Sequence, residues 1–167
     1  MNSILFREKF IVIRAKVNGG KTTTAGLLFL ELIKGAASFW IFDSSFNLIG
    51  DLIYGEDGEL YDFIGVVELD GKLIVVISQG DDADVLESLL DGLSDNLSAN
   101  GIKQVIDVIV CCARSRFIKN STIEMLTRRT DEANRFEIWT AWDENLDNKL
   151  GAKKKVVEEI ISKIKTL

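Results

Sequence analysis

Residues 10–32 read FIVIRAKVNGGKTTTAGLLFLEL, which is an apolar run, a glycine-containing segment and a helix-forming run in immediate succession. Gly19 and Gly20 can adopt the positive φ angles that turn successive backbone N–H groups toward one anion. A helix that begins beside them adds the partial positive charge of its N-terminus. Lys21 can reach the β- and γ-phosphates of a nucleotide, and the Thr22 hydroxyl can ligate Mg²⁺. The stretch therefore predicts a loop that cradles the phosphates of a nucleoside triphosphate.

The segment Ala15–Thr22 resembles the phosphate-binding loop of the P-loop NTPases, with Ala15 where the stringent pattern has glycine. The resemblance implies that ATP or another nucleoside triphosphate is the ligand and that Mg²⁺ accompanies it. It assigns nucleotide binding to Lys16, Asn18, Gly19, Gly20, Lys21, Thr22 and Thr23. Lys21 is also the expected catalytic lysine, because it neutralises charge on the phosphates. The alternative is an ordinary Gly-Gly turn followed by solvated first-turn residues.

Length and composition indicate one soluble globular domain. The chain has 167 residues, of which 47% are hydrophobic and 28% are charged. No apolar run is long enough to span a bilayer, and residues 1–9 lack the order of a signal peptide. We therefore expect a cytoplasmic protein with no membrane partner.

The charge balance and the missing histidine limit the chemistry. The net charge of −6 disfavours nucleic acid as the main partner, because binding to a polyanion depends on neutralising its phosphates. With no histidine in the chain, imidazole bases and Ser-His-Asp triads are excluded. Cys111 and Cys112 are adjacent in an apolar run, so they are expected to be small buried hydrophobes and not a disulfide.

Apolar runs alternate with helical patterns, which predicts an α/β fold. We expect the three-layer P-loop NTPase arrangement, with a mostly parallel five-stranded sheet and one extra hairpin strand. The five strands are expected at Phe10–Arg14, Ser38–Phe42, Lys72–Ile77, Val105–Cys112 and Phe136–Trp142, with the hairpin arm at Gly65–Leu69. Helices are expected at Thr22–Lys34, Phe46–Tyr54, Ala83–Leu97, Lys119–Asn134 and Lys153–Lys165.

Polar residues follow every expected strand, at the edge where open α/β sheets bind ligands. Asp43 follows the second strand and can act as a base or hold an acceptor, or it can simply cap the helix expected after it. Asp81 follows the Lys72–Ile77 run and can ligate Mg²⁺ with Thr22, or it can serve as a residue at a helix N-terminus. Asp143-Glu144-Asn145 ends the last strand.

Basic residues gather in one part of the chain, namely Arg114, Arg116, Lys119, Arg128 and Arg129. One of these arginines can neutralise transition-state charge as part of a lid, and Arg128 is the residue that we assign to this role. The alternative is a solvated helix face.

Two families within this superfamily are similar to the chain. Small P-loop kinases, such as shikimate kinase and the nucleotide kinases, match it in element order and length, and Phe42-Asp43-Ser44 looks like their acceptor-binding Asp-Ser. The turn at Ile77–Gly80 is similar in position to their acceptor loop, although only one glycine is present. This resemblance implies phosphoryl transfer from ATP to a small-molecule acceptor.

The partition and nitrogenase-type ATPases are the second family. Lys16 stands five residues before Lys21, as their signature lysine does, and Thr22–Ala25 follows as in those proteins, but Val17 and Asn18 replace two glycines. This resemblance implies a homodimer that forms on ATP and in which Lys16 contacts the partner's nucleotide. A third alternative is a degenerate, non-catalytic P-loop domain that acts as an interaction module.

Overall fold

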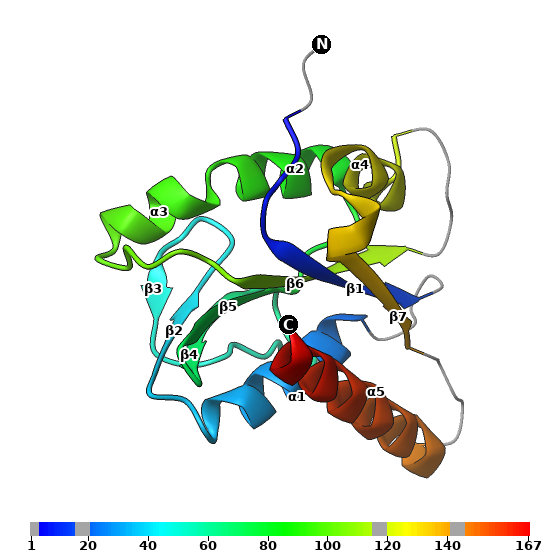
Figure 1. Ribbon diagram of the computed structural model, residues 1–167. Helices are drawn as coiled ribbons and strands as arrows, with labels where there is room; N and C mark the ends of the chain where they lie inside the picture. The colour runs from blue at the N-terminus through cyan, green and yellow to red at the C-terminus, as the bar shows by residue number, and fades with distance from the viewer. Residues whose placement is uncertain (1–3, 16–20, 115–119, 141–145) are drawn as a thin grey trace.

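The computed structural model describes residues 4–15, 21–114, 120–140 and 146–167, and it has an α/β architecture (Figure 1). One mixed sheet runs through the molecule in the order β3-β2-β4-β5-β6-β1-β7. Its strands are β1 (Lys9–Ala15), β2 (Ser38–Phe42), β3 (Leu48–Ile49), β4 (Ile64–Leu69), β5 (Lys72–Ile77), β6 (Val108–Arg114) and β7 (Arg135–Trp139).

Helices cover both faces of this sheet (Figure 1). One face carries α1 (Lys21–Ile33) and α5 (Leu146–Thr166), and the other carries α2 (Ala83–Asp91), α3 (Leu93–Ala99) and α4 (Thr122–Arg129). Each face has its own cluster of buried apolar side chains, because the strand residues alternate between the two faces. In β1, for example, Val12 belongs to the α2 side and Ile13 to the α1 side.

The sheet is more mixed than the expected five parallel strands with one hairpin arm, so that expectation was wrong in detail. β5, β6, β1 and β7 are parallel neighbours, but β2, β3 and β4 join them through antiparallel pairs. The Asp70-Gly71 turn does form the expected hairpin, with both turn residues at positive φ. The β4 arm lies between β2 and β5. As a result, β3, β2, β4 and β5 form an antiparallel part of the sheet.

The expected helix at Phe46–Tyr54 is absent from the structure. Asp43 accepts hydrogen bonds from the backbone N–H groups of Ser45 and Asn47, which closes a tight turn directly after β2. Phe46 takes a φ of +62° in this turn, and the chain returns as the short strand β3 beside β2. A local side-chain-to-backbone turn therefore replaces the first turn of the predicted helix.

Other boundaries shift in ways that local chemistry explains. The expected helix Ala83–Leu97 is divided at Gly92, which ends α2 and precedes α3. The predicted Lys119–Asn134 helix ends at Arg129 and is followed by a 3₁₀ turn at Glu132–Asn134. The last helix begins at Leu146, seven residues before the position expected from its apolar spacing.

Cys111 and Cys112 are both fully buried and free, as predicted. Among the described residues, no helix combines the length and the apolar composition that crossing a bilayer requires.

The packing of α1 predicts that alanine substitutions at two adjacent positions change the free energy of unfolding by very different amounts. Phe29 is fully buried and packs against Phe63, with ring centroids 5.6 Å apart, whereas Leu30 is 36% exposed. Phe29→Ala is expected to lower the free energy of unfolding by about 3–5 kcal/mol, since it leaves a cavity between helix and sheet. Leu30→Ala is the matched control and should cost less than about 1 kcal/mol. Urea denaturation of both variants measures the difference, and equal losses would contradict this packing.

Candidate phosphate-binding site

The candidate site lies at one edge of the sheet, where several strands end together. β1, β5, β6 and β7 are parallel, and β2 runs in the same direction because two antiparallel steps separate it from β5. Their carboxyl ends therefore share one edge, as sequence analysis required for a ligand site. The N-terminus of α1 begins at this edge, directly after β1 (Figure 1).

Lys21 is the first residue of α1 and its side chain is only 10% exposed. Its ammonium Nζ lies 3.4 Å from Oδ1 of Asp81, whose own side chain is 62% exposed. Below Lys21, the buried Cys112 thiol donates to the Lys21 carbonyl at 3.9 Å. The structure therefore brings together two residues that the sequence proposed separately, a lysine for phosphate and a carboxylate for Mg²⁺.

The first turn of α1 is also tied to the end of β7. The hydroxyls of Thr24 and Thr140 lie 3.2 Å apart in a buried position, and Thr140 N donates to the Arg14 carbonyl at 2.8 Å. No acidic residue occupies the first turn of α1, so the positive end of its dipole is not neutralised from within that turn. Thr22 is half-buried and Thr23 is exposed in this turn.

The loop after β5 is fixed on both sides of Asp81. A Cβ atom on Gly80 would lie 2.0 Å from the Cys112 carbonyl oxygen, so only glycine permits this close approach. The Thr122 hydroxyl donates to the Gly80 carbonyl at 2.7 Å, and Asp82 caps α2 by accepting from Val85 N at 3.1 Å. Asp81 is thus held at the site edge by a loop that cannot shift without breaking these contacts.

Asp62 is a site-edge residue that sequence analysis missed. Ser78, at the end of β5, donates its hydroxyl to Oδ1 of Asp62 at 3.0 Å and receives a hydrogen bond from Phe63 N at 2.8 Å. Asp62 precedes β4, which runs opposite to β5, so the start of β4 lies at the same edge as the end of β5. Its signal in the sequence is the hairpin, because a residue that precedes an antiparallel strand reaches the same edge as residues that follow the parallel strands.

The buried Cys112 thiol shows that these charges lie close together. Burial raises the pKa of Cys112 to about 12, while the nearby Lys21 ammonium acts to lower it and the carboxylates of Asp62 and Asp81 act to raise it. One lysine and two carboxylates therefore influence the same buried sulfur atom.

Asp43 is engaged in its own turn. Oδ1 accepts from Ser45 N at 2.9 Å and Asn47 N at 3.0 Å, and Oδ2 accepts from the Asn47 side-chain amide at 3.0 Å. The hydrogen bonds from Asn47 and Ser45 lower the pKa of Asp43 below its usual value, which makes it a weaker proton acceptor. Asp43 therefore caps no helix, since the expected one is absent, and its oxygens close a turn instead, which disfavours the role of a base.

Arg128 is not brought to Lys21. It lies in the last turn of α4, where its guanidinium contacts Glu87 of α2 at 3.3 Å. The adjacent Arg129 binds Glu87 and Asp91 and donates to the Ile4 carbonyl, ahead of β1. These contacts lie toward the amino end of β1, opposite the edge that carries Lys21.

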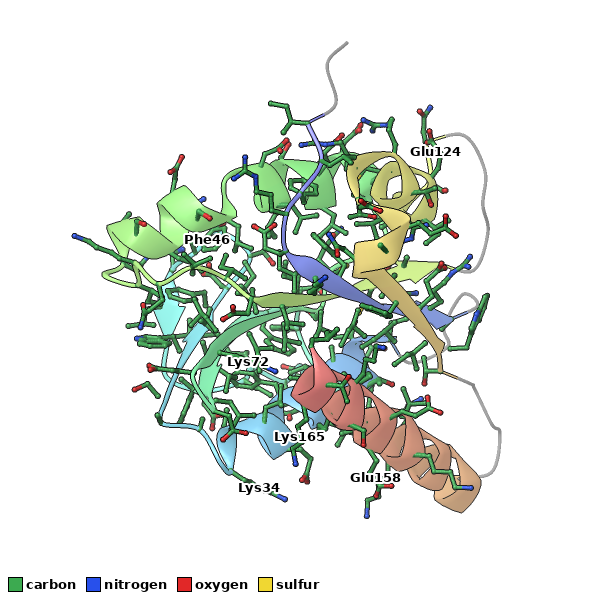
Figure 2. The ribbon with its side chains drawn as sticks, in the orientation of Figure 1. Lys34, Phe46, Lys72, Glu124, Glu158 and Lys165 are labelled. Atoms are coloured by element: carbon green, nitrogen blue, oxygen red, sulfur yellow. The ribbon has the colours of Figure 1, made fainter. Side chains whose placement is uncertain are left out.

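A shallow hollow of about 480 Å³ lies between the β2–β3 turn and α2. Phe46, which Figure 2 labels near this turn, forms part of its wall and packs against Phe42 with ring centroids 6.1 Å apart. Its other lining residues are Ser44, Gln79, Asp84, Val85, Ser88 and Leu89. Gln79 Oε1 is buried and has no hydrogen-bond partner within the part of the chain that the structure describes, which is unusual for an amide oxygen.

Several sequence-predicted site residues fall outside the described ranges. They are Lys16, Asn18, Gly19, Gly20, Arg116, Lys119 and the Asp143-Glu144-Asn145 segment. Arg114 ends β6 and pairs with Ala15 through its backbone.

The residues present fit a nucleotide and Mg²⁺ in chemical type. A nearly buried ammonium at a helix N-terminus suits phosphate, and the solvent-exposed carboxylate of Asp81 suits a hard cation. Within the described residues, no group of three or more His, Cys, Asp or Glu side chains could hold a metal alone. Mg²⁺ at nucleotide sites usually needs only one or two carboxylates, because phosphates and waters complete its shell.

A comparison of the chain with protein families, curated proteins and solved structures finds no match.

The Asp43 turn predicts a specific pH dependence of stability. Its folded-state pKa is lowered, so its stabilising contribution is present above the unfolded value near 3.8 and is lost as the pH falls through the folded value. The difference in melting temperature between wild type and Asp43→Ala should be largest near about pH 7 and should narrow below about pH 4.

Thermal unfolding across this pH range measures the effect. Asp95→Ala on α3, which also removes an exposed carboxylate, serves as the control and should show no comparable narrowing. If the difference in melting temperature between wild type and Asp43→Ala stayed the same at every pH, the assigned hydrogen bonds would be contradicted.

Proposed function

We propose that this chain binds a nucleoside triphosphate with Mg²⁺ at the carboxyl edge of its sheet and transfers the terminal phosphoryl group. The observation that carries the proposal is the Lys21 ammonium, which is nearly buried at the N-terminus of α1 and lies 3.4 Å from Asp81. Burying a lysine is costly unless its charge is used or paired. A phosphate site explains why a lysine and a carboxylate lie together where five strands end.

Each residue has a defined role in this proposal. Lys21 neutralises the β- and γ-phosphates, and the backbone N–H groups at the start of α1 add to the positive potential. Thr22 and Asp81 would hold Mg²⁺, which would neutralise part of the charge on the phosphates. Lys16, Asn18, Gly19, Gly20 and Thr23 complete the proposed nucleotide contacts.

The transfer step is a displacement at phosphorus. An oxygen of the acceptor forms a bond to the γ-phosphorus while the bond from that phosphorus to the β–γ bridging oxygen breaks, which leaves the nucleoside diphosphate. The proton of the acceptor passes to solvent. Asp43 is not assigned to this proton, because its oxygens already accept three hydrogen bonds.

A small-molecule acceptor is the first candidate, and the hollow beside α2 supports it. The hollow adjoins the loop that carries Asp81, since Gln79 lines it. Ser44 and Ser88 offer hydroxyl groups to a polar molecule in this hollow. These groups favour an acceptor with hydroxyl or amine donors.

An ATP-hydrolysing dimer is the second candidate. The engagement of Asp43 in its turn favours it, because a kinase gains from a free carboxylate near the acceptor hydroxyl, whereas slow hydrolysis by water does not require one. Lys16 would then contact the nucleotide of the partner subunit.

Replacement of Lys21 tests nucleotide binding, which both candidate functions require. Lys21→Ala should abolish the rise in melting temperature that ATP with Mg²⁺ produces in the wild type, because the phosphates lose their principal cation. Lys34→Ala is the matched control, since Lys34 projects outward just after α1 (Figure 2) and pairs with Glu31 at 2.7 Å. A thermal-shift panel of nucleotides with Mg²⁺ measures both variants.

A wild-type protein that no nucleotide stabilises would contradict the proposal and favour a non-catalytic interaction module. If ATP with Mg²⁺ raised the melting temperature of Lys21→Ala as much as that of the wild type, the role of Lys21 in phosphate binding would be contradicted.

The two candidates are separated by oligomeric state. A switch ATPase should elute as a dimer only with ATP and Mg²⁺, and Lys16→Ala should abolish that dimer. A small-molecule kinase should keep one oligomeric state under all these conditions. Size-exclusion chromatography with light scattering measures the mass, with Lys34→Ala again as the control. ATP-dependent dimers of Lys16→Ala would contradict the switch mechanism.

A further inference from the structure

The hollow beside α2 has walls of different chemistry. The β2–β3 turn contributes the ring of Phe46, and α2 contributes two apolar side chains, Val85 and Leu89, which lie one helical turn apart. Asp84, in the first turn of α2, is the one charged residue among the described residues that line the hollow. The hollow therefore combines an aromatic ring, an apolar surface and a carboxylate.

The aromatic wall is held by an unusual backbone conformation. Phe46 has a φ of +62°, which a bulky residue rarely adopts. The backbone N–H groups of Ser45 and Asn47 donate to Asp43 and close the turn around it, and its ring packs against Phe42. Such conformations cluster where the position of a side chain matters for ligand binding.

The part of the chain that builds both walls has almost no positive charge. Between Lys34 and Lys103 the sequence has fourteen acidic residues and a single basic one, Lys72. Lys72, which Figure 2 labels, lies at the start of β5, whereas Gln79 of the hollow follows the end of that strand. Its ammonium donates to the Ile164 carbonyl at 3.0 Å. We therefore expect a negative electrostatic potential at the hollow.

The arginines of α4 do not neutralise Asp84. Arg128 and Arg129 bind Glu87, and Arg129 also binds Asp91. Both of these carboxylates lie nearer the C-terminal end of α2 than Asp84 does. Asp84 is exposed and has no ion-pair partner among the residues that the structure describes. Its carboxylate is therefore available to a ligand in the hollow.

We infer that this hollow binds a small molecule that carries an ammonium group on an apolar body. Asp84 pairs with the ammonium, and the Phe46 ring attracts the same cation through its face. Val85 and Leu89 contact the apolar part of the molecule. The charge of this site thus selects cations over neutral and anionic molecules of equal size.

The binding of this cation does not require a nucleotide. Its identification as the phosphoryl acceptor rests on the proposed function. In that role the molecule is an amino alcohol whose hydroxyl receives the phosphoryl group, because a protonated amine has no lone pair with which to attack phosphorus.

The test compares three probes of similar size and different charge. Phenylethanolamine is cationic at neutral pH, phenylethylene glycol has a hydroxyl in place of the amine, and mandelate is anionic. Heteronuclear NMR titration of the nucleotide-free wild type measures each affinity, and shifts of the Phe46, Val85 and Ser88 amides locate the site. Phenylethanolamine should bind at least about fivefold more tightly than the glycol, and mandelate should bind most weakly.

Two variants assign the selectivity to its residues. Asp84→Asn should weaken the binding of phenylethanolamine about fivefold and leave that of the glycol unchanged. Phe46→Leu keeps an apolar side chain without the ring and should weaken phenylethanolamine about threefold. Asp95→Asn removes the same unit of charge from exposed α3 and should behave as wild type. The NMR spectrum of each variant shows directly whether it is folded.

The outcomes separate this inference from the proposed function. Equal affinity of wild type for phenylethanolamine and the glycol, no binding of phenylethanolamine, or an unchanged affinity in Asp84→Asn would each overturn the cation site. If ATP with Mg²⁺ stabilises the protein in that case, the nucleotide site stands without it. If phenylethanolamine binds as expected but no nucleotide stabilises the protein, the cation site stands and phosphoryl transfer is overturned.

Discussion

A lysine ammonium that is nearly excluded from water must have its charge balanced, and this constraint organises one edge of the molecule. Lys21 begins α1 beneath the surface, and the balancing carboxylate comes from a loop 60 residues later in the chain. In this sheet β6 lies between β5 and β1, and the loop after β5 packs against the β6 backbone at Cys112. Gly80 permits that approach, and Thr122 holds it. The ion pair therefore depends on the strand order as much as on either residue.

The sequence predicted most elements because their signals are local. β2 and β5 have the expected bounds, and the β4–β5 hairpin follows from Asp70-Gly71, whose chemistry demands a two-residue turn. The failure at Phe46–Tyr54 has a local cause too, since the Asp43 side chain competes for the backbone N–H groups that a helix would use. The mixed character of the sheet was not predictable in the same way. β4 pairs with β5 on one edge and with β2 on the other. The second pairing depends on packing between distant segments, and no local pattern in β2 indicates it.

Sequence patterns placed some residues of this edge of the sheet correctly and missed others. Lys21 and Asp81 meet because both follow strands of one parallel set, which is a rule that sequence can apply. Asp62 escaped that rule because it precedes an antiparallel strand and so arrives at the same edge from the opposite direction. Arg128 was assigned from the charge of its neighbourhood alone, whereas Glu87 and Asp91 on α2 decide where the two arginines at the end of α4 lie.

The hairpin that supplies both Asp62 and Ser78 is closed at its far end by Asp70 and Gly71, both at positive φ. In an antiparallel pair, the residue numbers of facing partners have a constant sum, so the turn sets which residue stands opposite Ser78, namely Phe63 just before β4. One residue added to that turn would displace the partner by one position, about 3.4 Å, and would present the opposite face of the strand. The Asp70-Gly71 turn therefore fixes the alignment of the polar groups at the opposite end of the hairpin, although neither turn residue lies near them.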